Sequence, residues 1–197
     1  MSLAATVERP DPDVALARAL AHDLDRAFEP LVIAYRVRIV TFVARMLHDD
    51  ARAEEVAQDV FVRAYRALQA YSAGRREALR LRPWLYTIAR NLTRNAFRDA
   101  PPFADSLDYD DANPTAALID DEAAPEASVL RSETWQSVSD AVARLSAAIR
   151  PAFVMRYLDD LSYDEIAESL DQPIGTVKAS AHRGLLAVRA YLEKNDE

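Results

Sequence analysis

The 197-residue sequence contains no cysteine, which excludes disulfides, thiolate catalysis and cysteine-based zinc sites. Its three histidines, His22, His48 and His182, are far apart and form no metal-ligand pattern, so neither a metal nor another cofactor is expected. The sequence also lacks a glycine-rich phosphate loop and any convincing triad or paired-carboxylate pattern. An enzyme acting on a small-molecule substrate is therefore not expected.

Long apolar runs are missing as well. No run approaches the roughly 20 residues that a membrane-spanning helix needs, and the N-terminus lacks the basic-then-apolar order of a signal peptide. Half of the residues are nonetheless hydrophobic, which is enough to form a buried core. Together with the absence of cysteine, these features predict a cytoplasmic protein that is not embedded in the membrane.

Glycine and proline are scarce where the chain should be regular. The sequence has only three glycines, and no proline lies between Pro30 and Pro83. Apolar residues in that interval recur at helical spacing, without sustained alternation of period two, so the predicted fold class is all-α. The predicted helices span 25–47, 50–71, 81–99, 128–144, 147–160, 163–170 and 175–193.

Segment 100–127 interrupts this helical pattern. It holds four of the ten prolines and eight acidic residues, with no basic residue. This composition predicts a flexible, extended acidic linker. The linker divides the chain into two small helical domains, at 25–99 and 128–194, preceded by an extension at 1–24 to which the sequence assigns no role.

The net charge of −8 is unusual for a protein that binds DNA, but the charge is unevenly distributed. Segment 75–98 carries seven arginines and one glutamate. A local positive field can attract a polyanion even when the whole chain is acidic. On charge alone, solvated faces and tails are the favoured interpretation of these charge blocks.

Segment 53–71 predicts an amphipathic helix with a polar patch. Val56, Val60, Ala64 and Ala67 form its apolar stripe, widened by three further residues. Glu55, Gln58 and Asp59 fall away from the centre of that stripe. Periodicity alone supports only an ordinary solvated face. The functional alternative is that this acidic and amide patch docks on a basic partner.

Segment 81–99 combines aromatic, amide and arginine side chains. A helical wheel places Trp84 on the apolar side and Tyr86, Arg90 and Arg94 on the opposite side. Asn91 lies at the border and Arg98 at the edge. Arginines bind phosphates, aromatic rings stack on bases and amides read base edges, so this face suits single-stranded nucleic acid. The alternative is that Trp84 belongs to the core and the arginines are solvated.

Segment 161–193 predicts a helix-turn-helix. Ser162 and Glu165 have capping-box spacing, Asp171-Gln172-Pro173 ends the first helix, and a second helix opens near Thr176. The alternative is a plain helical hairpin. On the second helix, Lys178, Ala179, His182, Arg183 and Arg189 are expected to face outward, and Val177, Ala181, Leu185, Val188 and Leu192 to face inward.

The three segments read AEEVAQDVFVRAYRAL, RPWLYTIARNLTRNAFR and LSYDEIAESLDQPIGTVK. In this order they resemble the extracytoplasmic-function sigma factors of bacterial RNA polymerase. The resemblance implies that the first domain docks on the polymerase clamp helices through Glu55, Gln58 and Asp59. It further implies that this domain opens the promoter −10 element and holds its non-template strand, with Tyr71 and Asn91 around a flipped-out base. The implied −10 residues are Tyr71, Trp84, Tyr86, Asn91, Arg94 and Arg98.

The resemblance also implies that the second domain reads the −35 element in the major groove and touches the polymerase flap. The implied −35 residues are Thr176, Lys178, Ala179, Ser180, His182 and Arg183. The linker would run toward the active-centre cleft or the RNA exit path, and an anti-sigma factor would hold the protein inactive.

The reading helix departs from the family pattern. Relatives often have Lys-Ser-Arg-Leu-His-Arg-Ala-Arg from the position of Lys178, and this chain lacks two of those arginines and a serine. The −35 sequence that is read, or the strength of binding, is expected to differ. Gly184 should cost about 1 kcal/mol relative to alanine inside a helix, and close approach of a neighbouring helix would compensate.

Two other functions remain open from the residues alone. The first is a stand-alone helix-turn-helix regulator that binds duplex DNA without polymerase. The second is a degenerate sigma-like module that only binds and sequesters a protein partner.

Overall fold

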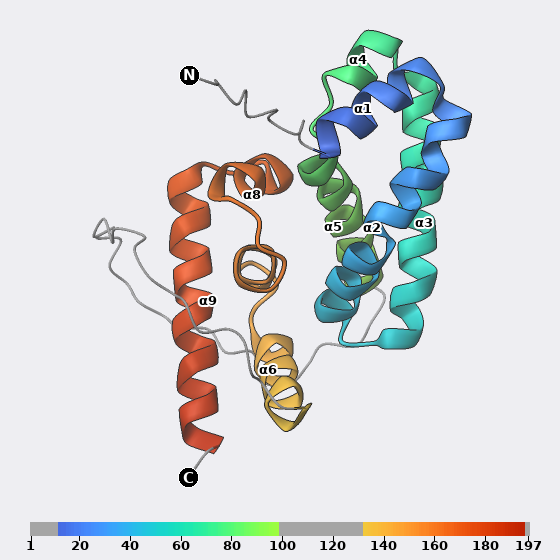
Figure 1. Ribbon diagram of the computed structural model, residues 1–197. Helices are drawn as coiled ribbons and strands as arrows, with labels where there is room; N and C mark the ends of the chain where they lie inside the picture. The colour runs from blue at the N-terminus through green and yellow to red at the C-terminus, as the bar shows by residue number, and fades with distance from the viewer. Residues whose placement is uncertain (1–11, 99–131, 196–197) are drawn as a thin grey trace, which may run out of the picture.

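The computed structural model describes residues 12–98 and 132–195, and every regular element in these ranges is helical (Figure 1). This confirms the predicted all-α fold with two helical domains. The predicted linker at 100–127 lies outside the described residues. The first domain contains α1 (Pro12–His22), α2 (Leu24–Leu47), α3 (Asp50–Ala70), α4 (Ala73–Glu77) and α5 (Leu81–Arg98). The second contains α6 (Ser132–Arg144), α7 (Arg150–Phe153), the π-helical turn η1 (Val154–Leu158), α8 (Tyr163–Leu170) and α9 (Ile174–Asn195).

Aspartate caps begin the two long helices of the first domain. Asp23 accepts a hydrogen bond from the Arg26 amide at 3.1 Å, and Asp49 accepts one from the Arg52 amide at 3.0 Å. Each cap satisfies an amide that would otherwise lack a partner at a helix start. α2 ends at His48, whose left-handed backbone turns the chain into α3. The buried core is formed by Leu31, Tyr35, Ile39 and Phe42 of α2, Ala57, Val60 and Ala64 of α3, and Leu81, Leu85 and Ala89 of α5.

Two short elements complete the first domain, and the sequence did not predict them. α1 buries Ala17 and Leu20 and packs against α4 and α2. Arg76 of α4 donates to the Leu20 carbonyl at 3.0 Å, which ties α4 to the end of α1. Residues 12–22 of the predicted extension therefore form a helix that packs onto the first domain.

The predicted capping box is present at the start of α8 in the second domain. The Ser162 hydroxyl accepts from the Glu165 amide at 3.3 Å, and the Glu165 carboxylate accepts from the Ser162 amide at 2.8 Å. α8 ends at Asp171 in the left-handed conformation, and α9 begins at Ile174. This is the predicted helix-turn-helix. Pro151 lies in the first turn of α7, as its missing amide requires.

Gly184 lies where α9 crosses α7. A β-carbon at this position would be 2.8 Å from Cβ of Phe153 and 3.1 Å from Cγ2 of Ile149. Only glycine permits this approach without displacement of the neighbouring helix. The compensation expected for a glycine inside the reading helix is therefore present.

The two domains pack against each other. α5 of the first domain contacts α8, and α2 contacts α6 and η1 (Figure 1). In the described ranges, no helix is long and apolar enough to cross a membrane. No group of three or more potential metal ligands occurs among these residues either.

Candidate promoter and polymerase interfaces

The polar patch on α3 is open to solvent. Glu55, Gln58 and Asp59 are all exposed, while Ala57 and Val60 on the other side of the helix are buried. The placement predicted from the helical wheel is thus confirmed for all three residues.

α2 and α3 also carry exposed apolar residues. Ile33 and Val37 project from α2, and Val62 projects from α3. Arg36 bridges the two helices by pairing with Glu54 at 3.3 Å. These apolar residues were not predicted from the sequence, although the spacing of Ile33 and Val37 off the buried face of α2 was a usable signal.

Two of the predicted −10 residues form an aromatic pair. The rings of Tyr71, at the end of α3, and Trp84, in the first turn of α5, have centroids 6.3 Å apart. Both side chains are half-buried. The guanidinium of Arg75 lies 3.8 Å from the Tyr71 ring centroid, in cation–π contact. Arg75 belongs to α4, a helix that was not predicted from the sequence. Its position in the arginine-rich segment 75–98 was the only sequence signal for a role in binding.

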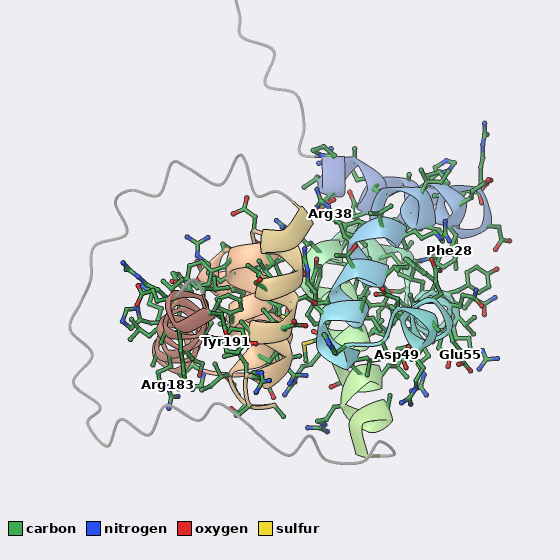
Figure 2. All side chains as sticks on the ribbon, turned by 90° about the horizontal axis from the view of Figure 1, so that it is seen from below. Phe28, Arg38, Asp49, Glu55, Arg183 and Tyr191 are labelled. Carbon is green, nitrogen blue, oxygen red and sulfur yellow. The ribbon has the colours of Figure 1, made fainter. Side chains whose placement is uncertain are left out.

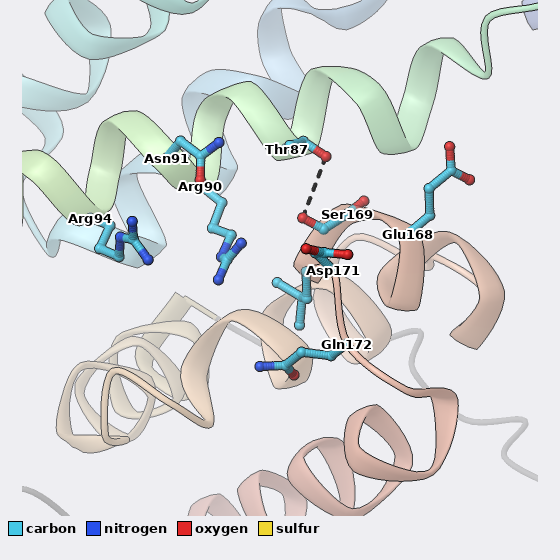
Figure 3. Close-up of a pocket in the computed structure, with 9 residues that line it drawn as sticks. Thr87, Arg90, Asn91, Arg94, Glu168, Ser169, Asp171 and Gln172 are labelled. Atoms are coloured by element: carbon cyan, nitrogen blue, oxygen red, sulfur yellow. Dashed lines mark hydrogen bonds between the residues drawn. The ribbon is translucent and has the colours of Figure 1, made fainter.

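Asn91 and Arg94 lie further along α5 and line an open pocket of about 600 Å³. Figure 3 shows Arg90 pointing from α5 toward the turn that carries Asp171 and Gln172. Burial lowers the pKa of Arg90, the neighbouring Arg94 lowers it further, and Asp171 acts in the opposite direction. The pocket therefore collects positive charge on its α5 side. The side chain of Arg98 lies outside the described residues.

Tyr86 does not lie on this open face, so its predicted placement beside Arg90 is wrong. Its side chain is 0% exposed, and its ring packs edge-on against Phe42 with centroids 5.0 Å apart. Burial raises the pKa of the Tyr86 hydroxyl, and the nearby charge of Asp159 adds to the effect. The helical wheel placed Tyr86 wrongly because it assumed that α5 has a single buried side. In the structure, α2 and α3 cover one side of α5 and the second domain covers another.

Most predicted −35 residues are accessible on α9. Thr176, Lys178, Ala179 and His182 are exposed, and Arg183 is half-buried. Figure 2 shows Arg183 on the side of the molecule opposite Glu55, so the two predicted interfaces face different directions. The ammonium of Lys178 lies 5.4 Å from the Tyr163 ring centroid on α8.

Ser180 and Leu185 differ from their predicted positions. Ser180 is only 5% exposed and cannot contact a DNA groove in this arrangement, whereas Leu185, predicted to face inward, is exposed. The buried stripe of α9 runs through Val177, Ser180, Ala181, Gly184, Ala187 and Val188. The close crossing at Gly184 rotates α9 so that the stripe passes through 180 and 184 rather than 185.

Comparison with known proteins is consistent with this geometry. The family model described as Sigma-70 region 2 matches residues 31–101, and that described as Sigma-70, region 4 matches residues 135–188. The ECF RNA polymerase sigma factor SigW of Bacillus subtilis is 32% identical over 170 residues, covering 84% of this chain and 89% of the relative. The RNA polymerase sigma-H factor of Pseudomonas aeruginosa is 34% identical over 173 residues, covering 85% and 87%. The chain belongs to the ECF sigma factors.

Two solved structures share the fold. CnrH, solved with the cytosolic domain of CnrY, superposes with a TM-score of 0.67 at 22% identity, covering 93% of this chain and 99% of CnrH. The sigma factor RpoE from Bartonella quintana, solved with the anti-sigma factor NepR, gives a TM-score of 0.63 at 19% identity, covering 84% and 96%. As a sigma factor, the chain is a transcription-initiation subunit that binds core RNA polymerase and promoter DNA.

Proposed function

We propose that the exposed edge running from the end of α3 along α5 holds the non-template strand of the −10 element. The observation that carries this is that Tyr71, Trp84, Asn91 and Arg94 follow one another along that edge and remain accessible. The aromatic pair offers a stacking surface, the Asn91 amide suits the edge of a flipped base, and Arg94 suits the backbone. Arg98 is proposed for the backbone from its sequence position. Tyr86 supports the core of the domain and does not contact DNA.

The α9 surface is proposed to read the −35 element. Thr176, Lys178, Ala179 and His182 lie in the first turns of a helix-turn-helix reading helix, the part that enters the major groove in such motifs. Arg183 is proposed at the edge of that contact. Because two arginines of the usual pattern are missing, fewer charged contacts are available, and the salt dependence of −35 binding should be shallow.

Glu55, Gln58 and Asp59 are proposed to bind the clamp helices of core polymerase. An exposed acidic and amide patch suits a basic helical partner, and the exposed apolar Ile33, Val37 and Val62 of α2 and α3 supply contact area. In the same proposal the second domain touches the polymerase flap, and residues 100–127 run toward the active-centre cleft or the RNA exit path. The domain limits are proposed as 25–99 and 128–194, with α1 packed onto the first.

An anti-sigma factor is proposed to regulate this protein. The support is that CnrH and the Bartonella RpoE, which share its fold, were solved with the cytosolic domain of CnrY and with the anti-sigma factor NepR. We expect the protein in the cytoplasm, where bacterial RNA polymerase transcribes the chromosome.

In-vitro transcription with core polymerase tests this function. The full-length chain should direct a promoter-specific transcript, and Asn91→Ala combined with Arg94→Ala should abolish it. Arg189→Ala is the matched control, because Arg189 is exposed on α9 and pairs with Glu193 at 2.9 Å outside the proposed contacts. No transcript above that of core alone would contradict the proposal. Binding to core without a transcript would instead identify a degenerate module that sequesters its partner.

A further inference from the structure

α4 packs on α1 at one end of the first domain (Figure 1). It begins two residues after Tyr71, which ends α3, so the position of α4 determines what surrounds the Tyr71 ring. α4 has five residues, and none of them is fully buried. A helix this short is not stable through its own hydrogen bonds, so contacts with the rest of the domain must hold it in place.

Arg76 links α4 to a rigid point on α1. Its half-buried guanidinium donates to the Leu20 carbonyl at 3.0 Å. Leu20 belongs to the last turn of α1, where helix carbonyls lack intrahelical partners and the helix dipole favours a positive group. The Leu20 side chain is fully buried, so the core of the domain fixes the carbonyl that Arg76 binds.

A second polar contact between the two helices is exposed. Nε of Arg18 on α1 lies 3.6 Å from the Glu77 carboxylate on α4, and both side chains are more than half exposed. Ion pairs of this kind contribute little because water screens them. Of these two polar contacts, the one made by Arg76 is therefore expected to fix α4.

The position of α4 also fixes Arg75, the neighbour of Arg76. The Arg75 amide donates to the hydroxyl of Ser72, the N-cap of α4, at 3.3 Å. Its guanidinium lies 3.8 Å from the centroid of the Tyr71 ring, so it covers one face of the ring and leaves the other for stacking. Because Arg75 is exposed, its remaining donors are available to a base or a phosphate beside that ring.

We propose that α1 is a positioning element for −10 recognition, with Arg76 as the positioning residue. α1 holds α4, and α4 holds the Arg75 guanidinium over one face of Tyr71. This restricts where a flipped base stacks and which of its edges meets Arg75. The choice of base at that position therefore depends on α1, which lies in the extension to which the sequence assigned no role. The inference rests on the −10 role proposed above for Tyr71, because a fixed ring has a consequence only if a base stacks on it.

Binding of the holoenzyme to a series of −10 non-template oligonucleotides tests the proposal. Each oligonucleotide carries A, C, G or T at one position, and the ratio of the weakest to the tightest Kd measures the base preference there. Arg76→Ala should reduce this ratio about twofold to fivefold at one position, the size expected for an exposed cation–π contact. Arg75→Ala should reduce it at the same position, and the other positions should keep their wild-type ratios.

Conservative variants separate positioning from folding. Arg76→Lys keeps a donor for the Leu20 carbonyl and should restore most of the wild-type preference. Two controls should keep it fully: Arg66→Ala, which removes an exposed arginine of α3, and Gly74→Ala, whose β-carbon has no atom within 4 Å. An Arg76→Ala protein that melts at a lower temperature but keeps the full preference would overturn the proposal, because the contact would then only stabilise the domain.

Hydrogen exchange on the full-length protein tests the first step without DNA. The Ala78 amide donates to the Gly74 carbonyl at 3.1 Å, and the Leu79 amide donates to the Arg76 carbonyl at 3.2 Å. In Arg76→Ala these two amides should exchange about twofold to tenfold faster, the range expected for one lost hydrogen bond, while the amides of α3 keep their wild-type rates. Unchanged exchange at Ala78 and Leu79 would contradict the attachment of α4 by Arg76.

The combined outcomes separate this proposal from the proposed function. If the wild-type holoenzyme shows no base preference at any −10 position although α4 loosens in Arg76→Ala, the −10 role of Tyr71 is refuted and the attachment of α4 to α1 is retained. If the wild type shows a preference that Arg76→Ala keeps, the −10 role is retained and positioning by α1 is refuted.

Discussion

α5 and α9 are both proposed to read DNA, yet the protein buries them differently. On α9 the buried residues form a single stripe, and the rest of the helix faces solvent. On α5, Leu85 and Tyr86 are adjacent in sequence and both fully buried, because different partners cover different sides of the helix. A helix with one covered side is free to bind at any time. On α5 the second domain covers a further side of the helix, while Asn91 and Arg94 stay exposed.

The largest effect is expected from replacing Tyr86 on α5, which should lower the free energy of unfolding. Tyr86→Ala removes a fully buried ring that packs against Phe42, and truncations of this kind cost about 3–5 kcal/mol of unfolding free energy. Tyr86→Phe keeps the ring and should change stability by less than about 1 kcal/mol. Guanidinium unfolding followed by tryptophan fluorescence measures both.

The same pair of variants decides whether Tyr86 contacts DNA. With a core role, Tyr86→Phe keeps normal promoter opening. If Tyr86→Ala were as stable as wild type but bound the −10 strand poorly, the tyrosine would be a DNA contact and not a core residue.

Gly184 tests the packing that orients α9. Alanine normally stabilises a helix relative to glycine by about 1 kcal/mol, but here its β-carbon would meet Phe153 at 2.8 Å. Gly184→Ala should therefore destabilise the second domain by about 1–3 kcal/mol. Gly175→Ala is the matched control on the same helix: nothing lies within 4 Å of its β-carbon, and it should be neutral or slightly stabilising. Thermal unfolding compares them, and equal melting temperatures would contradict the tight crossing.

The sequence predicted those features that leave a local or periodic signal. The capping box at Ser162, the end of α8 at Asp171 and the long helices all depend on residues within a few positions of each other. The exposed patch at Glu55 was placed correctly because α3 has one buried side. In each case, the residues that determine the feature belong to one helix or to its cap, so the sequence alone was sufficient to predict it.

Features that depend on distant partners were not predictable in this way. Tyr86 is buried partly by a domain that begins more than thirty residues later, and Arg82 binds backbone carbonyls, which carry no sequence signature. α1 was missed because it buries only Ala17 and Leu20, against a helix of five residues. The −10 face was therefore identified by its residue types, while its accessibility depended on tertiary contacts.

Changing pH should shift the balance between closed molecules, whose two domains pack together around the buried Asp159 carboxylate, and open molecules, whose domains are apart. Burial raises the pKa of Asp159 to about 6, against the opposing effects of Arg45, Arg82 and Arg38 and of the Tyr86 hydroxyl. Opening returns the carboxyl to its ordinary range near 3.8. The closed state therefore binds the extra proton, and its advantage grows as pH falls through 6 and fades as pH rises through 6.

The expected size is an increase of up to about tenfold in the closed-to-open ratio between pH 7 and pH 5. Distances between spin labels at Arg66→Cys and Ala190→Cys, two exposed positions on α3 and α9 of a chain without cysteine, measure it at the two pH values. Asp159→Asn, which cannot ionise, should show a ratio that is independent of pH over this interval. A wild-type ratio that rises with pH would show that the charged pair with Arg45 outweighs burial.

The smallest effect is expected on α9, from Lys178 and Ser180, which lie two positions apart. Lys178 is exposed on the proposed reading face and Ser180 is buried, so Lys178→Ala should weaken −35 binding a few-fold while Ser180→Ala should leave it unchanged. If Lys178 binds a phosphate, its loss should also lower the slope of log affinity against log salt by about 1. Holoenzyme binding to a duplex carrying only the −35 element, measured over a salt series, gives both quantities. A weaker affinity with an unchanged slope would mean that Lys178 reads a base edge, and an effect from Ser180→Ala instead would mean that α9 rotates on binding DNA.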